Sequence, residues 1–175
     1  MTVQPLATTT QLEAYRSGDP DLLVAAAQGA VRGYCGWHVA PSVEQTVTLD
    51  GPGTKVLGLP TLHLTAVTAV EDVDTTANGE TVDLTTLQWS EAGYLLRDCC
   101  WTSKLRGVTV TFTHGFDPVP PEVQTVVLDL AETIKAGMGG ATRTQVGAVS
   151  VQYAAEQMTT MHRLVLDRYR LPPSP

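Results

Sequence analysis

Two periodicities follow one another in residues 107–137, GVTVTFTHGFDPVPPEVQTVVLDLAETIKAG. Val108, Val110 and Phe112 alternate with threonines, which predicts a strand with one buried face. Pro121 suits the first position of a helix, because the missing N–H has no partner there in any case. Apolar residues then recur three or four positions apart, as the buried face of a helix requires: Val123, Val126, Val127, Leu130 and Ile134. The stretch therefore predicts a strand that leads directly into a helix.

The segment before this stretch is rich in Thr, Val and Gly and has the texture of short strands. Alternation predicts one strand in residues 42–49 and another in residues 61–70, the latter with Leu62, Leu64 and Ala66 on one face. Asn78-Gly79 is a strong signal for a tight hairpin turn. Further short strands are expected at residues 55–59, around Val82, and at 87–89 and 94–96. We expect an antiparallel β region of five to seven strands over residues 40–115.

Two helices are predicted near the N-terminus. Thr10 and Glu13 form a capping-box pattern for residues 11–17, which Gly18 closes. Asp19 and Pro20 have the residue types that begin a second helix. The apolar positions expected on its buried face are Leu23, Ala26, Ala27, Ala30 and Tyr34.

The region after residue 137 is predicted to contain an exposed loop at 141–147 and a strand at 148–153. A last helix is expected at 155–171, with Met158, Met161 and Val165 facing inward. Its basic residues lie near the C-terminal end, where positive charge suits the helix dipole. Those residues are Arg163, Arg168 and Arg170.

The order of these elements predicts an α+β fold in which N- and C-terminal helices pack together around an inserted antiparallel β module. We expect a single domain over residues 1–175. Residues 10–37 and 117–171 would form its helical part, and residues 40–115 the β insertion.

Composition excludes several classes of function. The chain has 175 residues and a net charge of −7, so nucleic acid is not expected as a general partner. Residues 1–135 carry sixteen acidic and seven basic groups, whereas residues 136–175 carry two acidic and four basic groups. No apolar run is long enough for a membrane helix, and residues 1–10 lack the pattern of a secretory signal. Three cysteines, two of them adjacent, do not indicate a disulfide framework.

The sequence contains no recognised catalytic, phosphate-binding or metal-binding motif, so we expect no enzyme, no cofactor and no metal site. A cation site at Glu71, Asp72 and Asp74 is less favoured than a solvated acidic loop. An enzyme would require two residues of one set to meet in a cleft: His38, His63, His114, Asp98 and Cys99. A β-type ligand-binding module would require the three tryptophans, Trp37, Trp89 and Trp101, to gather on one exposed face.

The series of segments resembles the head-to-tail adaptor, or head–tail connector, proteins of long-tailed bacteriophages. Five stretches carry the resemblance: residues 19–23 with 34–37, 106–116, 120–123, 145–151 and 166–172. It implies a non-enzymatic subunit of a dodecameric ring in the virion neck, assembled in the host cytoplasm. Such a ring would bind the portal protein on one side and a stopper or tail protein on the other, while DNA passes through its channel without sequence-specific binding.

In related adaptors the C-terminal segment tends to engage the portal. Carried over to this chain, the resemblance implies that portal contacts are made by Arg163, Arg168, Tyr169, Arg170 and Leu171. Arg and Tyr are favoured residues at protein interfaces. Another virion structural protein, such as a tail terminator or head-closure subunit, is the alternative that remains open, and only an adaptor should bind portal directly.

Overall fold

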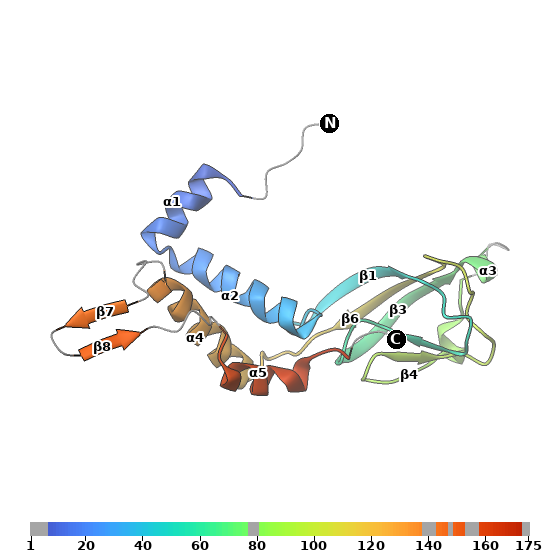
Figure 1. The fold of residues 1–175 in the computed structure, drawn as a ribbon. Helices are drawn as coiled ribbons and strands as arrows, with labels where there is room; N and C mark the ends of the chain where they lie inside the picture. The colour runs from blue at the N-terminus through green and yellow to red at the C-terminus, as the bar shows by residue number, and fades with distance from the viewer. Residues whose placement is uncertain (1–6, 77–80, 138–142, 147–148, 153–157, 173–175) are drawn as a thin grey trace. The chain divides into compact units, whose positions relative to one another are not determined.

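The computed structural model describes residues 7–76, 81–137, 143–146, 149–152 and 158–172. The chain divides into two compact units. The helical unit combines Met1–Tyr34 with Pro121–Arg168, and the β unit combines Cys35–Pro120 with Tyr169–Pro175. The predicted α+β class is confirmed, because helices precede and follow the β strands along the chain (Figure 1).

Helix α1 spans Thr9–Ser17, and its N-terminal cap differs from the prediction. Thr8, rather than Thr10, accepts the hydrogen bond from the backbone N–H of Gln11, whose side chain accepts one from the backbone N–H of Thr8 in return. Gln11 completes the capping box as well as the expected Glu would, and the helix therefore begins two residues earlier. Gly18 ends α1 in the left-handed conformation, as predicted.

Helix α2 spans Pro20–Cys35, and the Asp19 carboxylate accepts a hydrogen bond from the backbone N–H of Asp21, as expected of a cap. Its buried residues repeat every four positions: Leu23, Ala27, Val31 and Cys35. The prediction that Ala26 and Ala30 are also buried was wrong, because both lie on the exposed side of the helix.

Helix α4 spans Pro121–Gly137 and buries Val123, Val126, Leu130 and Ala131, which confirms the helix predicted from the periodicity. Strands β7, Arg143–Val146, and β8, Val149–Gln152, pair as an antiparallel ribbon. The prediction of an exposed loop at 141–147 was therefore wrong for the residues of β7. These residues form a strand because their pairing partner, β8, follows directly in the chain. The strand predicted at 148–153 is confirmed as β8.

Helix α5 spans Thr160–Leu166 and is followed by a 3₁₀ turn, Asp167–Tyr169. The helix was expected to begin at residue 155. Instead the Thr159 hydroxyl caps it by accepting from the backbone N–H of His162. This start fixes which face is buried: Leu166 is fully buried, and Met161, predicted to face inward, is exposed.

The β unit contains two three-stranded antiparallel sheets. The first has the order β1-β6-β3, with β1 at Val43–Leu49, β6 at Val108–His114 and β3 at Leu64–Asp72. The second has the order β2-β5-β4, with β2 at Val56–Gly58, β5 at Tyr94–Leu96 and β4 at Gln88–Trp89. Two short helical segments, α3 at Val73–Thr76 and a 3₁₀ turn at Leu84–Thr86, follow β3 in the chain. The strand predicted around Val82 is absent there, and the Asn78-Gly79 turn lies outside the described residues.

Strand β6 is the centre of the first sheet and alternates cleanly between buried and half-buried residues, as predicted. Strand β3 does not alternate, because two irregularities shift its register against β6. Leu64, Val67 and Val70 therefore face the core three positions apart, whereas Ala66, predicted to share their face, is exposed.

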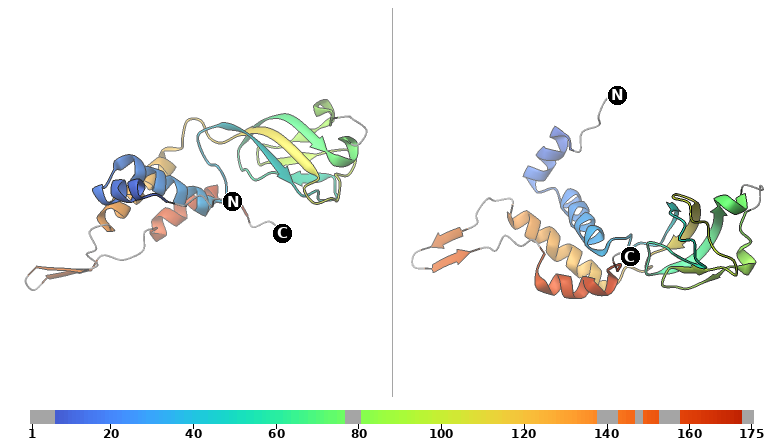
Figure 2. Two further views of the ribbon diagram at one scale, coloured as in Figure 1. Left: turned by 90° about the horizontal axis from the view of Figure 1, so that it is seen from above. Right: turned by 45° about the vertical axis from the view of Figure 1, so that its right-hand side comes forward.

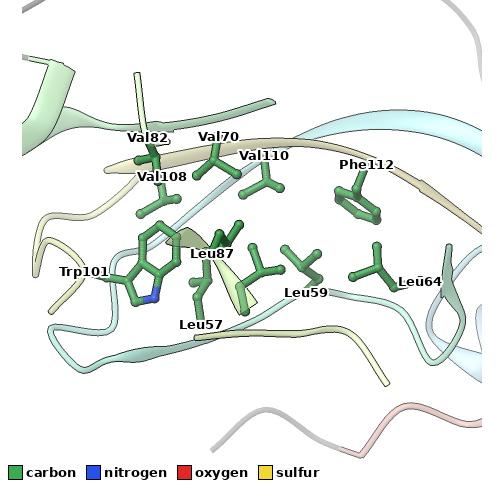
Figure 3. Packing of buried hydrophobic residues seen from close by; sticks show 11 residues of the cluster. Leu57, Leu59, Leu64, Val70, Val82, Leu87, Trp101, Val108, Val110 and Phe112 are labelled. Atoms are coloured by element: carbon green, nitrogen blue, oxygen red, sulfur yellow. The ribbon is translucent and has the colours of Figure 1, made fainter. Parts of the chain in front are cut away.

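The core of the β unit, a cluster of buried hydrophobic side chains, lies between the two sheets (Figure 3). Trp101 packs at the Val108 end of this core, and Phe112 and Leu64 pack at the other end. Its members come from both sheets and from the loops that join them: Leu57, Leu59, Leu64, Val70, Val82, Leu87, Leu95, Trp101, Val108, Val110 and Phe112.

Candidate assembly site at the C-terminal segment

An aromatic cluster forms in the β unit where strand β6 ends. His114, the last residue of β6, is buried, and its ring lies beside those of Phe112, Trp37 and His38, at centroid distances of 4.8, 6.1 and 5.7 Å. The ring of Phe116 lies 6.2 Å from Trp37. These residues come from segments far apart in the sequence. The cluster therefore connects residues 37–38, at the start of the segment 35–120, with residues 112–116, near its end.

A histidine ring covers one face of Phe116. The ring of His63 stacks on it at 4.2 Å with an interplanar angle of 6°, and Nδ1 of His63 lies 2.7 Å from a carboxylate oxygen of Glu91. Through this stacking, His63 and Phe116 form one aromatic pair, to which a further ring is added.

The C-terminal segment, residues 169–172, supplies that ring. The ring of Tyr169 meets Phe116 edge-on at 5.6 Å and 87°. The indole Nε1 of Trp37 donates a hydrogen bond to the backbone carbonyl of Tyr169 at 2.6 Å, and the backbone N–H of Leu171 donates to the carbonyl of Cys35 at 2.9 Å. The segment is therefore anchored on the β unit by its backbone and by one ring.

The electrostatics of the cluster keep His114 neutral near pH 7. Burial, and to a lesser extent the nearby His38, lower its pKa to about 4. Nε2 of His114 lies 2.9 Å from Oε1 of Gln45. A neutral imidazole in an apolar, aromatic environment has a structural role in packing.

In the helical unit, α5 is held by its neighbours at two points. The hydroxyl of Tyr34 donates a hydrogen bond to the Asp167 carboxylate at 2.6 Å, and Nε2 of His162 lies 3.8 Å from a carboxylate oxygen of Asp129 in α4. These contacts fix the buried face of α5. The opposite face carries Met161 and Leu164, which are 69% and 64% exposed.

The five residues that the resemblance singled out fall into two groups. Arg163 and Arg168 are exposed in the helical unit, and Arg170 is exposed in the segment that follows. Tyr169 and Leu171 are half-buried, because they pack on their own chain. The structure thus separates side chains that can meet a partner from side chains that anchor the segment.

Sequence reasoning missed Met161 and Leu164 as surface residues. The signal that could have found them is Thr159, a helix-capping residue type, because a helix that begins there places residues 162 and 166 on the buried face. Met161 and Leu164 then fall outside that face.

An enzyme would require two residues of the predicted set of five to meet in a cleft, and the structure brings two of them together. His38 and His114 do lie side by side, but His114 is buried and held neutral as described. Cys99 lies at the other end of the β unit, where it accepts a hydrogen bond from the Arg97 guanidinium at 2.9 Å, and Arg97 stacks over Trp101. Strand β6 separates the two ends by roughly 20 Å. Asp98 is exposed next to Cys99 in the chain.

The acidic run at residues 71–74 has partners within the protein. The buried carboxylate of Asp72 accepts a hydrogen bond from the Arg97 guanidinium at 2.8 Å, and Asp74 pairs with Lys104 at 2.6 Å. The hydrogen bond from Lys104 lowers the pKa of Asp74. Among the described residues, no group of three or more His, Cys, Asp or Glu side chains could hold a metal ion.

The tryptophans do not form a common exposed surface. Trp37 and Trp101 are buried in different parts of the β unit, and Trp89 alone is exposed. A stacking platform for sugars or bases would have needed the three tryptophans on one exposed face, and the structure does not have this arrangement. No helix in the described part of the chain has both the length and the apolar character needed to span a membrane.

Comparison with known proteins identifies the fold. No family model matches the sequence, and no curated protein matches it. Among solved structures, the chain is similar to a chain in the neck of a native gene transfer agent (GTA) particle, computed with C12 symmetry, with 16% identity and a TM-score of 0.53. The similarity covers 100% of this chain and 98% of that chain.

A second match is to a chain in the virion of the native gene transfer agent particle, with 16% identity, a TM-score of 0.51 and the same coverage of both chains. At this identity the two matches show a shared fold. They confirm, at the level of the fold, the resemblance to neck proteins of phage-like particles.

Proposed function

We propose that this chain is a structural, non-enzymatic subunit of a virion neck, and that it acts as the ring-forming adaptor between portal and tail. The observation that carries the proposal is the fold shared over the full chain with a neck component of a phage-like particle. Its location would then be the virion neck, after assembly in the host cytoplasm.

The proposed assembly is a ring of twelve copies, as in the neck described with C12 symmetry. The chain would bind portal protein on one side of the ring and a stopper or tail protein on the other. Repeated use of one asymmetric interface closes into such a ring when the rotation between copies divides the circle evenly.

The residues proposed to meet the portal lie in α5 and in the segment that follows it. Met161 and Leu164 supply apolar contact, and the exposed arginines supply charge, a combination that suits a protein interface. Tyr169 and Leu171, which the resemblance placed among the portal contacts, would instead hold the segment in a defined position. Preorganisation of this kind lowers the entropy cost of binding.

The exposed face of the first sheet suits a neck through which DNA slides. Its rows are threonines that hydrogen-bond to one another, such as Thr46 with Thr111 at 2.9 Å and Thr48 with Thr109 at 3.3 Å. Strands β1, β3 and β6 contain no Lys or Arg. Such a face offers no cation to hold a phosphate, so passing DNA would not be retained.

The test is electron microscopy of the purified protein mixed with its portal protein. A closed ring stacked on portal is the expected result. Binding to a tail or head-closure component without any binding to portal would contradict the adaptor role and favour the alternative, another structural protein of the virion.

The portal-facing surface can be tested separately by charge reversal. Arg168→Glu should weaken co-assembly with portal at least tenfold, since an Arg at the centre of an interface commonly contributes that much. Lys135→Glu makes the same change of charge at the exposed end of α4 and is the matched control. Equal effects of the two substitutions would show that α5 and the segment after it do not belong to the portal interface.

A further inference from the structure

Helix α1 is well capped at both ends and yet buries no residue. The capping box at Thr8 and the left-handed Gly18 satisfy its terminal backbone groups, but none of its nine residues is buried. Leu12 is 47% exposed and Tyr15 is 40% exposed, and these two large side chains share one face, three positions apart. A helix of nine residues is marginal in water without tertiary packing. Among the described residues, none packs closely enough on α1 to bury any of its side chains.

The outer face of α2 has the complementary property. Opposite the buried Leu23, Ala27 and Val31, the helix exposes small residues: Ala25, Ala26, Gly29, Ala30 and Gly33. A side chain added at Gly29 or Gly33 would meet no other atom within 4 Å. Among the described residues of the helical unit, only the Leu23 side of α2 is buried, and Gln28 is exposed beside these small residues.

Within one copy, α1 does not reach this face. The backbone N–H groups of Gly18 and Asp19 donate to the carbonyls of Tyr15 and Ala14, which fixes the two-residue turn between the helices. The two helices diverge from this turn in Figure 1 and in the right-hand view of Figure 2. Among the described residues of the helical unit, none buries the outer face of α2.

We propose that α1 of one copy packs on the outer face of α2 of a second copy. Leu12 and Tyr15 would sit over the small residues of α2, where the low side-chain bulk lets the two backbones approach closely. Each copy donates one α1 and accepts another through a different surface, which is a head-to-tail interface that can close into a ring. The proposal rests on the proposed function, because it names the contact between neighbours in the ring.

The charges favour an antiparallel arrangement. Arg16 lies beside Tyr15 near the C-terminal end of α1, and Asp21 lies in the first turn of α2. Antiparallel packing brings Arg16 of one copy towards Asp21 of the next, and it also opposes the two helix dipoles. Both residues are exposed in one copy, so they can meet across the interface.

Disulfide trapping tests the contact directly. In a Cys99→Ser, Cys100→Ser background, Leu12→Cys with Gly29→Cys should cross-link under mild oxidation into a ladder of oligomers that extends to the size of the ring. Thr10→Cys with Gly29→Cys places the first cysteine on the opposite face of α1 and is the matched control, which should yield at most trace dimer. Cross-linking within one copy would produce no ladder and would overturn the proposal.

A charge swap tests the orientation without new cysteines. Arg16→Glu and Asp21→Lys should each raise the concentration needed for assembly several-fold, and the double variant should assemble as the parent does, because every copy then carries a reversed pair. Failure of the double variant to restore assembly would contradict the antiparallel contact.

The two ideas fail in different ways. Rings that form normally, on electron micrographs, but give no ladder with Leu12→Cys and Gly29→Cys would refute the α1 contact and leave the neck role standing. A chain that stays monomeric with every neck component would refute both.

Discussion

Trp37 donates its indole N–H to the backbone carbonyl of Tyr169, 132 positions later in the chain, at 2.6 Å. The bond joins the first residues of the β unit to the segment that returns to it from the helical unit. Because the acceptor is the backbone carbonyl of Tyr169, the hydrogen bond fixes the path of the chain at this residue. The side chains of the segment are not needed for this bond.

Replacing Trp37 with Phe should loosen the C-terminal segment. The loss of one hydrogen bond costs about 1 kcal/mol, which corresponds to roughly a fivefold rise in the population of the opened segment. Cleavage by trypsin after Arg170 should accelerate by that factor, because proteolysis follows local opening. Trp89→Phe, at an exposed site in β4, is the control. Equal cleavage rates in the two variants would show that the bond does not anchor the segment.

The buried pair of Arg97 and Asp72 should be the most sensitive ionic contact in the described chain. Asp72 is 1% exposed, and it also accepts a hydrogen bond from the backbone N–H of Thr102. Arg97→Met leaves this carboxylate buried without its cation and should cost about 3–5 kcal/mol in urea unfolding. Lys104→Met removes the exposed partner of Asp74 and should change stability little. A loss as small as that of the control would contradict the prediction.

The stability of the β unit should depend on pH through His114. Its pKa is lowered to about 4 in the folded protein, whereas an unfolded histidine titrates near 6.5. Between these values the unfolded state binds the proton and the folded state does not. Stability therefore falls as pH decreases from about 6.5 to 4, by at most about 3 kcal/mol.

His114→Gln removes this titration, so the difference in unfolding free energy between the parent and the variant should change across that pH range and be constant above pH 7. Urea unfolding at a series of pH values measures it. A difference that does not vary with pH would show that His114 titrates alike in both states.

Phe112 should make the largest apolar contribution among the described core side chains. It is fully buried at the centre of β6, and truncation to Ala should cost about 3–5 kcal/mol through lost burial and the cavity that remains. Thr113→Ala, the next residue on the opposite face, should cost less than about 1 kcal/mol. Thermal or urea unfolding compares the two. A similar loss from both would indicate that the core collapses around the deletion.

Local patterns predicted those elements whose structure depends on near neighbours. The alternation around Val110 and the helical spacing from Val123 to Leu130 each identify a buried face, because strand and helix periods differ. The capping residues Asp19 and Gly18 fixed helix ends for the same reason. The α+β order followed from these elements.

Long-range pairing set the features that the pattern did not reveal. The register shifts in β3 exposed Ala66, and they arise from pairing with β6, more than forty positions later. The strand β7 and the late start of α5 likewise depend on a partner strand and on one capping hydroxyl.

The candidate site was the least predictable part, since its geometry is assembled from distant segments. The basic residues near the C-terminus were visible in the sequence, but nothing there distinguished Tyr169, which anchors the segment, from Arg168, which is exposed. That distinction depends on Phe116 and Trp37, which lie more than fifty positions earlier.

The return of Tyr169 to the β unit also sets an order of events on the ribosome. Residues 35–120 leave the exit tunnel first, but the edge of Phe116 and the indole N–H of Trp37 cannot meet Tyr169 until the ribosome has also translated residues 121–168. A nascent or prematurely terminated chain thus lacks the anchored segment. Under the proposed function, a chain that ends before this point would lack the preorganised segment proposed to contact the portal.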